Sequence, residues 1–335
     1  MRMPMGRIRA KLVRFNQYQL RLILVCLFTL FGFINLSVLV APLGEEEKHQ
    51  RLMRARETDE LIEKKAKSTA GVYALARRRV PEDDFLRLRF KLVQRQEEFF
   101  SYGHDSDNNI EIRASTISSL AHALDKFYVK ECNTKLSSWA SRKADMGPGC
   151  IAALKAPIVH KEVSARVRYR YYMNQVTWSY SYAWWGWSRW EEELDWMSLA
   201  GVNLALAHCG QEEIWFQVWS EILSPQPFRS SEFFTGIAYL AWHRMGNVQS
   251  IGYPLRREWM KGQLQLQKKI LKRMTELGIQ PILPAFNLHI PRQMLENFPR
   301  IKFEKASFWS GFFNEKHSGL YRLSAGDPWA ERISK

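Results

Sequence analysis

Apolar and polar residues follow regular patterns in the first half of the chain, and these patterns predict a small domain. In residues 86–92 an apolar side chain stands at every second position with basic ones between, which is the period of a half-buried strand, and residues 109–115 repeat it. Apolar residues then recur at helical spacing, and Thr116 or Ser118 can cap the helix that they predict. Residues 61–148 are therefore expected to form a small α/β domain.

From residue 160 onward, short apolar runs alternate with longer amphipathic segments. The strand-like runs are residues 171–178, 202–207 and 279–286, and the helical segments are residues 188–201, 212–223 and 263–277. Strands that alternate with helices pair in parallel, because each helix carries the chain back across the sheet. The pattern therefore predicts either a (β/α)8 barrel or a doubly wound sheet.

The longest uncharged stretch precedes both patterns. Residues 22–43 carry no charged side chain, and about 20 apolar residues are enough to cross the hydrocarbon core of a bilayer. A cleaved signal peptide has a shorter apolar region of about 7 to 15 residues, and Pro42 would hinder cleavage after Ala41. We expect a transmembrane helix that acts as a signal anchor here, with a signal peptide as the alternative.

The charges on either side of this segment predict its orientation. Residues 1–21 are basic and contain no acid, whereas acids follow in residues 44–60, which we interpret as a charged stalk. Because basic flanks stay on the cytosolic side, residues 1–21 are expected in the cytosol and residues 44–335 in the lumen or outside. The sequence thus predicts a single-pass type II membrane protein with a lumenal domain.

The net charge could instead indicate a nucleic-acid partner. The formal charge is +15, but six of the basic residues lie within the first 43 residues, where no acid balances them. The remaining lysines and arginines are interspersed with acids and form no motif for a groove or a single strand. We therefore expect an ordinary solvated surface and no nucleic-acid partner.

Cysteine spacing and loop composition offer no metal or cofactor site. Cys26 lies in the apolar segment, and Cys132 and Cys150 could pair in an oxidising compartment, which leaves Cys209 over. No cysteine spacing resembles a zinc site, and no glycine-rich turn for a phosphate or a dinucleotide follows the predicted strands. We expect neither a metal nor a cofactor.

Candidate functional residues follow the three predicted parallel strands. In both architectures the carboxyl ends of the strands carry the functional groups, which selects residues 174–178, 208–213 and 286–289. The rings between Trp178 and Trp187 would line a bowl at this end. Aromatic rings with a few amide, carboxylate and imidazole groups suit a sugar, because its C–H faces lie against the rings while its hydroxyls form hydrogen bonds.

Several aromatic and acidic residues also have a purely structural interpretation. Trp190 and Trp196 lie within a predicted helix and are expected to pack in the core. The acids beside them, residues 191–193 and Asp195, are expected to form a solvated face near the start of that helix. Five residues stay open between a structural role and a ligand contact: Gln211, Glu212, Glu213, Trp242 and His289.

Three segments together carry a family resemblance. They are "RYRYYMNQVTWSYSYAWWGWSRWEEELDWMSLAGVNLALAHCGQEEIW", "EFFTGIAYLAWHRMGN" and "QPILPAFNLHIP". In this order and spacing they resemble the α-N-acetylglucosaminidases, family 89 of the glycoside hydrolases. The resemblance implies that family's N-terminal α/β domain in residues 61–148 and the first part of its catalytic (β/α)8 TIM-type barrel in residues 160–335.

The resemblance also implies an activity. It is that of a retaining exo-glycosidase that removes terminal α-linked N-acetylglucosamine from glycans such as heparan sulfate, in the secretory pathway or lysosome. In this family the two catalytic glutamates lie on later barrel strands, which would follow Lys335, so we expect an incomplete barrel and a fragment without catalytic residues. We regard Glu315, in an "FNE" run, as a coincidental match. The alternative is an inactive carbohydrate-binding or interaction protein that keeps the aromatic site.

Some residues that would hold the sugar follow from the same resemblance. Asn174, Trp242 and Trp309 match pocket residues of the family, whereas Leu288 replaces the glycine of the family's "GHVP" run. The residue pattern adds four further candidates for substrate binding, Tyr180, Gln211, Glu212 and His289. The expected ligand is therefore a glycan that ends in N-acetylglucosamine.

Overall fold

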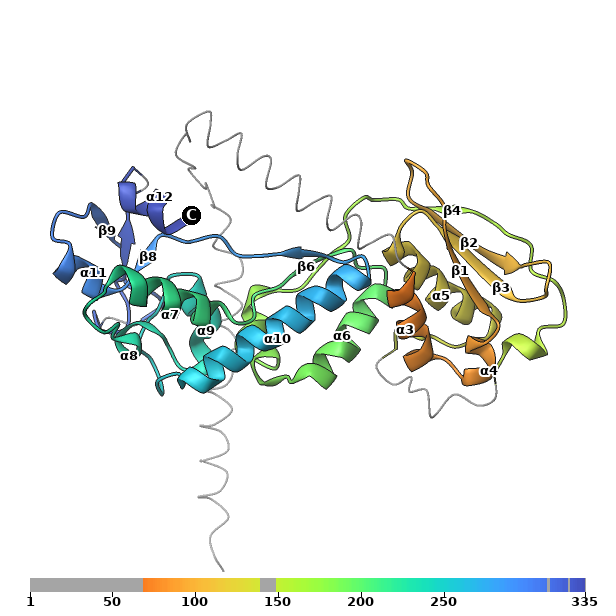
Figure 1. Cartoon of the computed structure of the whole chain (residues 1–335), viewed down its shortest axis with the longest axis horizontal. Coiled ribbons are helices and arrows are strands. Elements are labelled where there is room, and N and C mark those ends of the chain that lie inside the picture. Colours follow the sequence, from red (N-terminus) through yellow and green to blue (C-terminus); the bar gives the residue numbers. More distant parts are fainter. Residues whose placement is uncertain (1–68, 139–148, 312–313, 325, 335) are drawn as a thin grey trace, which may run out of the picture. The chain divides into compact units, whose positions relative to one another are not determined.

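A computed structural model describes residues 69–138, 149–311, 314–324 and 326–334 (Figure 1). The predicted cytosolic segment, anchor and stalk, residues 1–60, lie outside these ranges. In the part that is described, no helix has the length and apolar character needed to cross a membrane. The transmembrane helix therefore stays a prediction.

A mixed four-stranded sheet with flanking helices forms the N-terminal part (Figure 1). Its elements are α3 (Ala70–Arg79), α4 (Glu82–Phe85), β1 (Leu88–Leu92), β2 (Phe99–His104), β3 (Ile110–Ala114), α5 (Ile117–Glu131), the 3-10 helix η2 (Ile151–Ala153) and β4 (Val163–Ser164). The strand order is β1-β3-β2-β4, in which β1 is parallel to β3, and β2 is antiparallel to β3 and β4. The two predicted strands and the helix after them are confirmed.

The alternating pattern explains β1 with one exception. Leu88 and Phe90 are buried and Arg89 is exposed, as a half-buried strand requires. Leu86, expected on the same buried face, is 62% exposed. It lies at the C-terminal end of α4 and not in the strand, so the prediction was wrong for this residue.

Capping and a disulfide fix the two ends of α5. The Thr116 hydroxyl oxygen accepts a hydrogen bond from the Ser119 N–H at 3.1 Å, so Thr116 is the cap. Cys132, which follows the last residue of α5, forms a disulfide with Cys150, with their Cα atoms 5.7 Å apart. The structure thus contains the pairing that the sequence left open.

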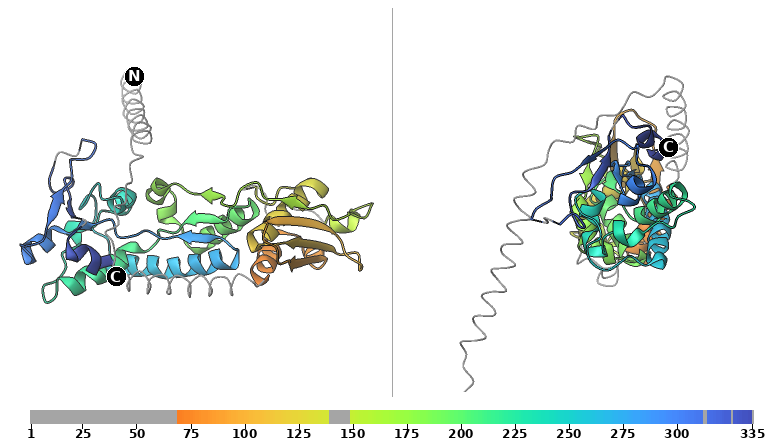
Figure 2. Two further views of the ribbon diagram at one scale, coloured as in Figure 1. Left: turned by 90° about the horizontal axis from the view of Figure 1, so that it is seen from above. Right: turned by 90° about the vertical axis from the view of Figure 1, so that its left-hand side faces the viewer.

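Three parallel strands joined by helices form the second sheet, as the sequence predicts. The strands are β5 (Tyr171–Tyr172), β6 (Leu204–Leu206) and β7 (Gln280–Ile282), in the order β5-β6-β7. The connecting helices are α6 (Trp187–Leu199), α7 (Gln211–Ile222) and α10 (Arg257–Glu276). α10 packs against both α6 and α7 (Figure 2).

Shorter elements lie between and beyond these strands. They are the 3-10 helices η3 (Gln175–Ser179), η4 (Tyr182–Trp184) and η5 (Ile237–Tyr239), the helices α8 (Ser230–Phe233), α9 (Leu240–Arg244), α11 (Arg292–Asn297) and α12 (Pro328–Ser334), and the strands β8 (His289–Ile290), β9 (Phe303–Lys305) and β10 (Tyr321–Leu323). The last three strands form an antiparallel sheet in the order β8-β10-β9. A buried cluster that includes Trp219, Phe233 and Ile290 joins this sheet to α7 and α8.

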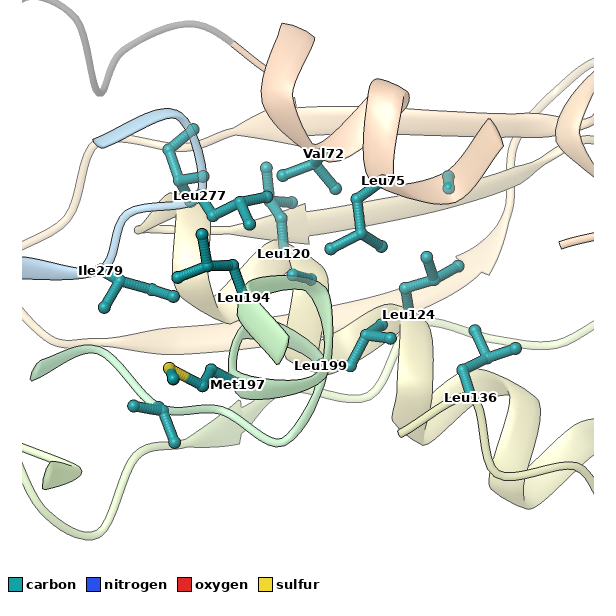
Figure 3. Packing of buried hydrophobic residues seen from close by; sticks show 14 of the residues in the cluster. Val72, Leu75, Leu120, Leu124, Leu136, Leu194, Met197, Leu199, Leu277 and Ile279 are labelled. Atoms are coloured by element: carbon teal, nitrogen blue, oxygen red, sulfur yellow. The ribbon is translucent and has the colours of Figure 1, made fainter. Parts of the chain in front are cut away.

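One buried cluster continues from the N-terminal sheet to the parallel sheet (Figure 3). It includes Val72 on α3, Leu120 on α5, Leu194 on α6, and Leu277 and Ile279 between α10 and β7. Each of these side chains is at most 1% exposed. The N-terminal helices therefore cover apolar surface that the parallel β/α units could not bury by themselves.

The acids of α6 do not all form the solvated face that the sequence predicts. Glu193 and Asp195 are 1% and 2% exposed. The Tyr182 hydroxyl donates to Glu193 at 2.8 Å, and Arg78 on α3 donates two hydrogen bonds to Asp195, at 2.9 and 2.7 Å. Burial raises the pKa of both carboxyl groups. The prediction was wrong for these two acids, whereas the core position of Trp190, 1% exposed, is confirmed.

Candidate functional site

Three aromatic side chains from separate segments lie together after β5. Tyr180 follows η3, Trp242 lies on α9, and Trp309 lies between β9 and β10. The Trp242 ring centroid is 6.2 Å from that of Tyr180 and 6.2 Å from that of Trp309. Tyr180 is 53% exposed. We call these three residues the aromatic floor, in which the Tyr180 side chain is open to solvent.

Backbone hydrogen bonds hold two parts of the floor. The Ala241 N–H donates to Ser179 Oγ at 2.7 Å, which ties α9 to η3. The Trp309 N–H donates to Ser318 Oγ at 2.7 Å. Both serines are buried, so these hydrogen bonds are shielded from water. They hold the backbone at Ala241, next to Trp242, and at Trp309 without a ligand.

Asn174 is exposed at the end of the strand that leads to the floor. Its Oδ1 accepts a hydrogen bond from the Val176 N–H at 2.8 Å, which caps η3 and ends the strand. Met173, just before it, has φ 107°, which breaks the extended backbone after Tyr172. This is why β5 stops short of the predicted residue 178. The amide N–H groups of Asn174 meet no partner within the described ranges, so they are available to a hydroxyl.

The polar residues after β6 are buried. His208 is 4% exposed, its ring lies over that of Trp178 with centroids 6.0 Å apart, and burial lowers the pKa of His208 to about 4. Gln211 Nε2 donates to the His208 carbonyl at 3.2 Å. Glu212 accepts two hydrogen bonds from Arg244, at 2.7 and 3.0 Å. Gln211 thus contacts His208 and Glu212 contacts Arg244, and His208 is a neutral imidazole at physiological pH.

After β7, Asn287 connects two segments and His289 is a core residue. Asn287 Nδ2 donates to the Arg244 carbonyl at 2.7 Å, and Asn287 Oδ1 accepts from the His289 N–H at 3.0 Å. The His289 ring is 0% exposed, lies 4.7 Å from that of Phe233, and has its pKa lowered well below the ordinary value by burial. Leu288 has φ 66°, in the left-handed region that favours glycine.

The structure thus divides the predicted binding residues. It brings Tyr180, Trp242 and Trp309 together and exposes Asn174, while three others are at most 8% exposed: Gln211, Glu212 and His289. A direct ligand contact of each residue stays a prediction. Among the described residues, no three histidine, cysteine, aspartate or glutamate side chains gather as metal ligands.

Sequence reasoning missed Arg244, and it selected Asn287 only within residues 286–289, without a role of its own. Their contacts with the other candidate residues join positions 32 and 43 apart along the chain, which no local pattern reveals. The available signal was the run "LAWHRMGN", in which a basic residue stands two positions after Trp242. A buried acid such as Glu212 requires a cation, and this run supplies one.

Parallel β/α units with candidate functional residues after the carboxyl ends of the strands are typical of TIM-barrel enzymes. A family model described as the α-N-acetylglucosaminidase (NAGLU) TIM-barrel domain matches residues 170–335. The α-N-acetylglucosaminidase of Homo sapiens is 38% identical over 229 residues, which are 68% of this chain and 30% of the human protein. Residues 170–335 therefore belong to the α-N-acetylglucosaminidase family, whose members are glycoside hydrolases.

Solved structures show the same fold. A family 89 glycoside hydrolase from Clostridium perfringens, in complex with 2-acetamido-1,2-dideoxynojirmycin, matches with a TM-score of 0.70 and 23% identity over 88% of this chain and 33% of that chain. The clostridial enzyme in complex with its substrate GlcNAc-α-1,4-galactose matches with a TM-score of 0.69, 22% identity and the same coverage. The chain thus spans 30% to 33% of the length of these relatives.

Proposed function

We propose that the aromatic floor binds a terminal α-linked N-acetylglucosamine and that the chain supplies this substrate-holding part of a retaining exo-α-N-acetylglucosaminidase. The observation that carries the proposal is the meeting of Tyr180, Trp242 and Trp309 from three segments. A pyranose presents apolar C–H faces that can lie on such rings, and Asn174 offers N–H donors to its hydroxyls. Family membership supports the identity of the sugar.

The two acids at the start of α7, after β6, are paired with arginines. Glu212 is paired with Arg244, and Glu213 with Arg257 at 2.9 Å, and both carboxylate side chains are at most 3% exposed. A retaining mechanism needs two carboxyl groups about 5 to 5.5 Å apart, one as nucleophile and one as acid and base. We therefore assign neither glutamate to the chemical step.

We also propose heparan sulfate as a substrate class for the whole enzyme.

Calorimetric titration of the full chain with methyl α-N-acetylglucosaminide tests the sugar site. Tyr180→Ala is expected to weaken binding about tenfold, because it removes one ring of the floor. Tyr253→Ala is the matched control, since Tyr253 is 91% exposed and forms no part of the floor. Equal effects of the two substitutions, or no binding by the unaltered chain, would contradict the proposal.

A second candidate function is carbohydrate binding without hydrolysis. The engagement of Glu212 and Glu213 by arginines favours it for the described residues. Incubation of the full chain with an aryl α-N-acetylglucosaminide separates the two functions. Sugar binding without release of the aryl group supports the binding protein, whereas turnover supports the hydrolase.

We further propose that residues 22–43 anchor the chain as a type II membrane protein of the secretory pathway or lysosome. The uncharged stretch and its basic flank support this. The chain should then stay in the membrane fraction after alkaline carbonate extraction. A mature protein that begins near Pro42 would instead show that the segment is a cleaved signal peptide.

A further inference from the structure

The buried ion pair of Glu212 and Arg244 involves α9, the short helix that also carries Trp242 of the aromatic floor. Arg244 Nε and a terminal guanidinium nitrogen donate to the two oxygens of Glu212, at 2.7 and 3.0 Å. The side chain of Arg244 is 6% exposed and that of Glu212 is 1% exposed. This leaves no open face of the carboxylate for a sugar. We propose that Glu212 and Arg244 are positioning residues, whose ion pair sets the orientation of α9 and hence of Trp242; the proposal rests on the sugar site proposed above.

α9 depends on such contacts because it is short. It comprises only Leu240–Arg244, and an isolated helix of this length is not stable in water. Its orientation must therefore come from its neighbours. Residues two positions apart on a helix point to different sides, so Arg244 can enter the interior while Trp242 joins the floor.

Each of the three parallel β/α units contributes one side chain to α9. After β5, Ser179 Oγ accepts from the Ala241 N–H at 2.7 Å. After β6, Glu212 pairs with the Arg244 side chain, and after β7, Asn287 donates to the Arg244 carbonyl at 2.7 Å. Two of these three contacts end on Arg244. These three contacts therefore fix the position of the Trp242 ring relative to the parallel sheet.

The geometry of the pair is specific for arginine. A planar guanidinium offers two parallel donors to a carboxylate, whereas the lysine ammonium offers a single point charge. Arg244→Lys therefore keeps the charge next to Glu212 but loses the two-pronged contact. This substitution changes the orientation of α9 more than it changes the charge next to Glu212. The proposal concerns that orientation.

A double-mutant cycle in the full chain separates positioning from general stability. Arg244→Lys is expected to weaken the binding of methyl α-N-acetylglucosaminide about tenfold when Trp242 is present, and less than about twofold in the Trp242→Phe background. Equal weakening in both backgrounds would overturn the proposal. Arg257→Lys is the matched control, because it alters the other buried glutamate pair of α7, at Glu213, and should leave binding unchanged.

A second readout does not require the sugar. In the full chain labelled with 5-fluorotryptophan, the fluorine resonance of Trp242, assigned by its loss in Trp242→Phe, should shift in Arg244→Lys and not in Arg257→Lys. An unshifted resonance in Arg244→Lys would overturn the positioning role even if the sugar binds. If the unaltered chain binds no sugar but the resonance shifts, the proposed function fails and the positioning role stands.

Discussion

His289 links the burial of a single side chain to the pH dependence of stability. Burial in the core keeps its imidazole neutral and lowers its pKa well below the ordinary value, and neither ring nitrogen has a hydrogen-bond partner in the described part of the chain. In the unfolded chain the imidazole takes a proton near pH 6.5. Because the unfolded state then binds a proton that the folded state excludes, the stability present above pH 6.5 is lost as the pH falls.

His289→Leu tests this coupling, because leucine is apolar and does not titrate. The loss in free energy of unfolding between pH 6.5 and 5 should be smaller in the variant by about 2 kcal/mol, since each pH unit is worth about 1.4 kcal/mol per excluded proton. Urea unfolding of both proteins at the two pH values measures the difference. The same loss in both proteins would show that His289 does not contribute to the acid sensitivity.

The residues that sequence reasoning misplaced are those whose partners are distant in the chain. Glu193 and Asp195 stand near the start of a helix, where acids are favourable on the surface, and this local rule predicted a solvated face. The partner of Asp195 is Arg78, 117 positions away. In contrast, Tyr180 was selected by a local signal, its position after a parallel strand, whereas Trp242 and Trp309 were named from the family resemblance.

Among the helices, α3 and α6 are joined by a buried ion pair that should contribute strongly to stability. Asp195 on α6 is 2% exposed, and each of its two carboxylate oxygens accepts a hydrogen bond from Arg78 on α3. Burial by itself would lower the pKa of Arg78, but the hydrogen bond to Asp195 raises it overall. Without Arg78, the buried Asp195 carboxylate would lose both of these hydrogen bonds. It would keep Arg273, whose nearest guanidinium nitrogen lies 3.8 Å away.

Arg78→Ala is expected to lower the free energy of unfolding by about 3 kcal/mol, the lower part of the range for breaking a buried pair. Arg95→Ala is the matched control, because Arg95 pairs with Glu162 at 2.8 Å while both side chains are about half exposed. Such exposed pairs contribute at most about 1 kcal/mol. Urea denaturation compares the two variants, and equal destabilisation would contradict the buried role of the α3–α6 pair.

Element boundaries were predicted less well than element types. β2 was missed because Phe99, Ser101 and Gly103 are buried on one face while Phe100 and Tyr102 are half-buried on the other, so no apolar–polar alternation marks it. The parallel pairing of the three later strands was predicted correctly, since the segments between them have clear helical periodicity. Where β5 ends could not be predicted, because it depends on the backbone angle of a single residue, Met173.

Among the described residues, one buried core continues from the N-terminal sheet to the parallel sheet, and sequence patterns did not predict it. Patterns along the chain predicted a small α/β domain and a separate set of barrel units. The buried cluster runs through both, and β4, with Val163–Ser164, pairs with β2 of the N-terminal sheet. Shared burial of this kind arises between segments that each look complete in sequence, because an amphipathic face does not reveal which partner covers it.

Tyr180, Trp242 and Trp309 are expected to form the sugar site of this α-N-acetylglucosaminidase region. A crystal structure of the full chain, saturated with methyl α-N-acetylglucosaminide, tests it most directly. We expect the pyranose ring against the aromatic floor, with a hydroxyl within hydrogen-bond reach of the Asn174 amide. Sugar bound elsewhere, or an empty floor in a chain that binds the sugar in solution, would contradict it.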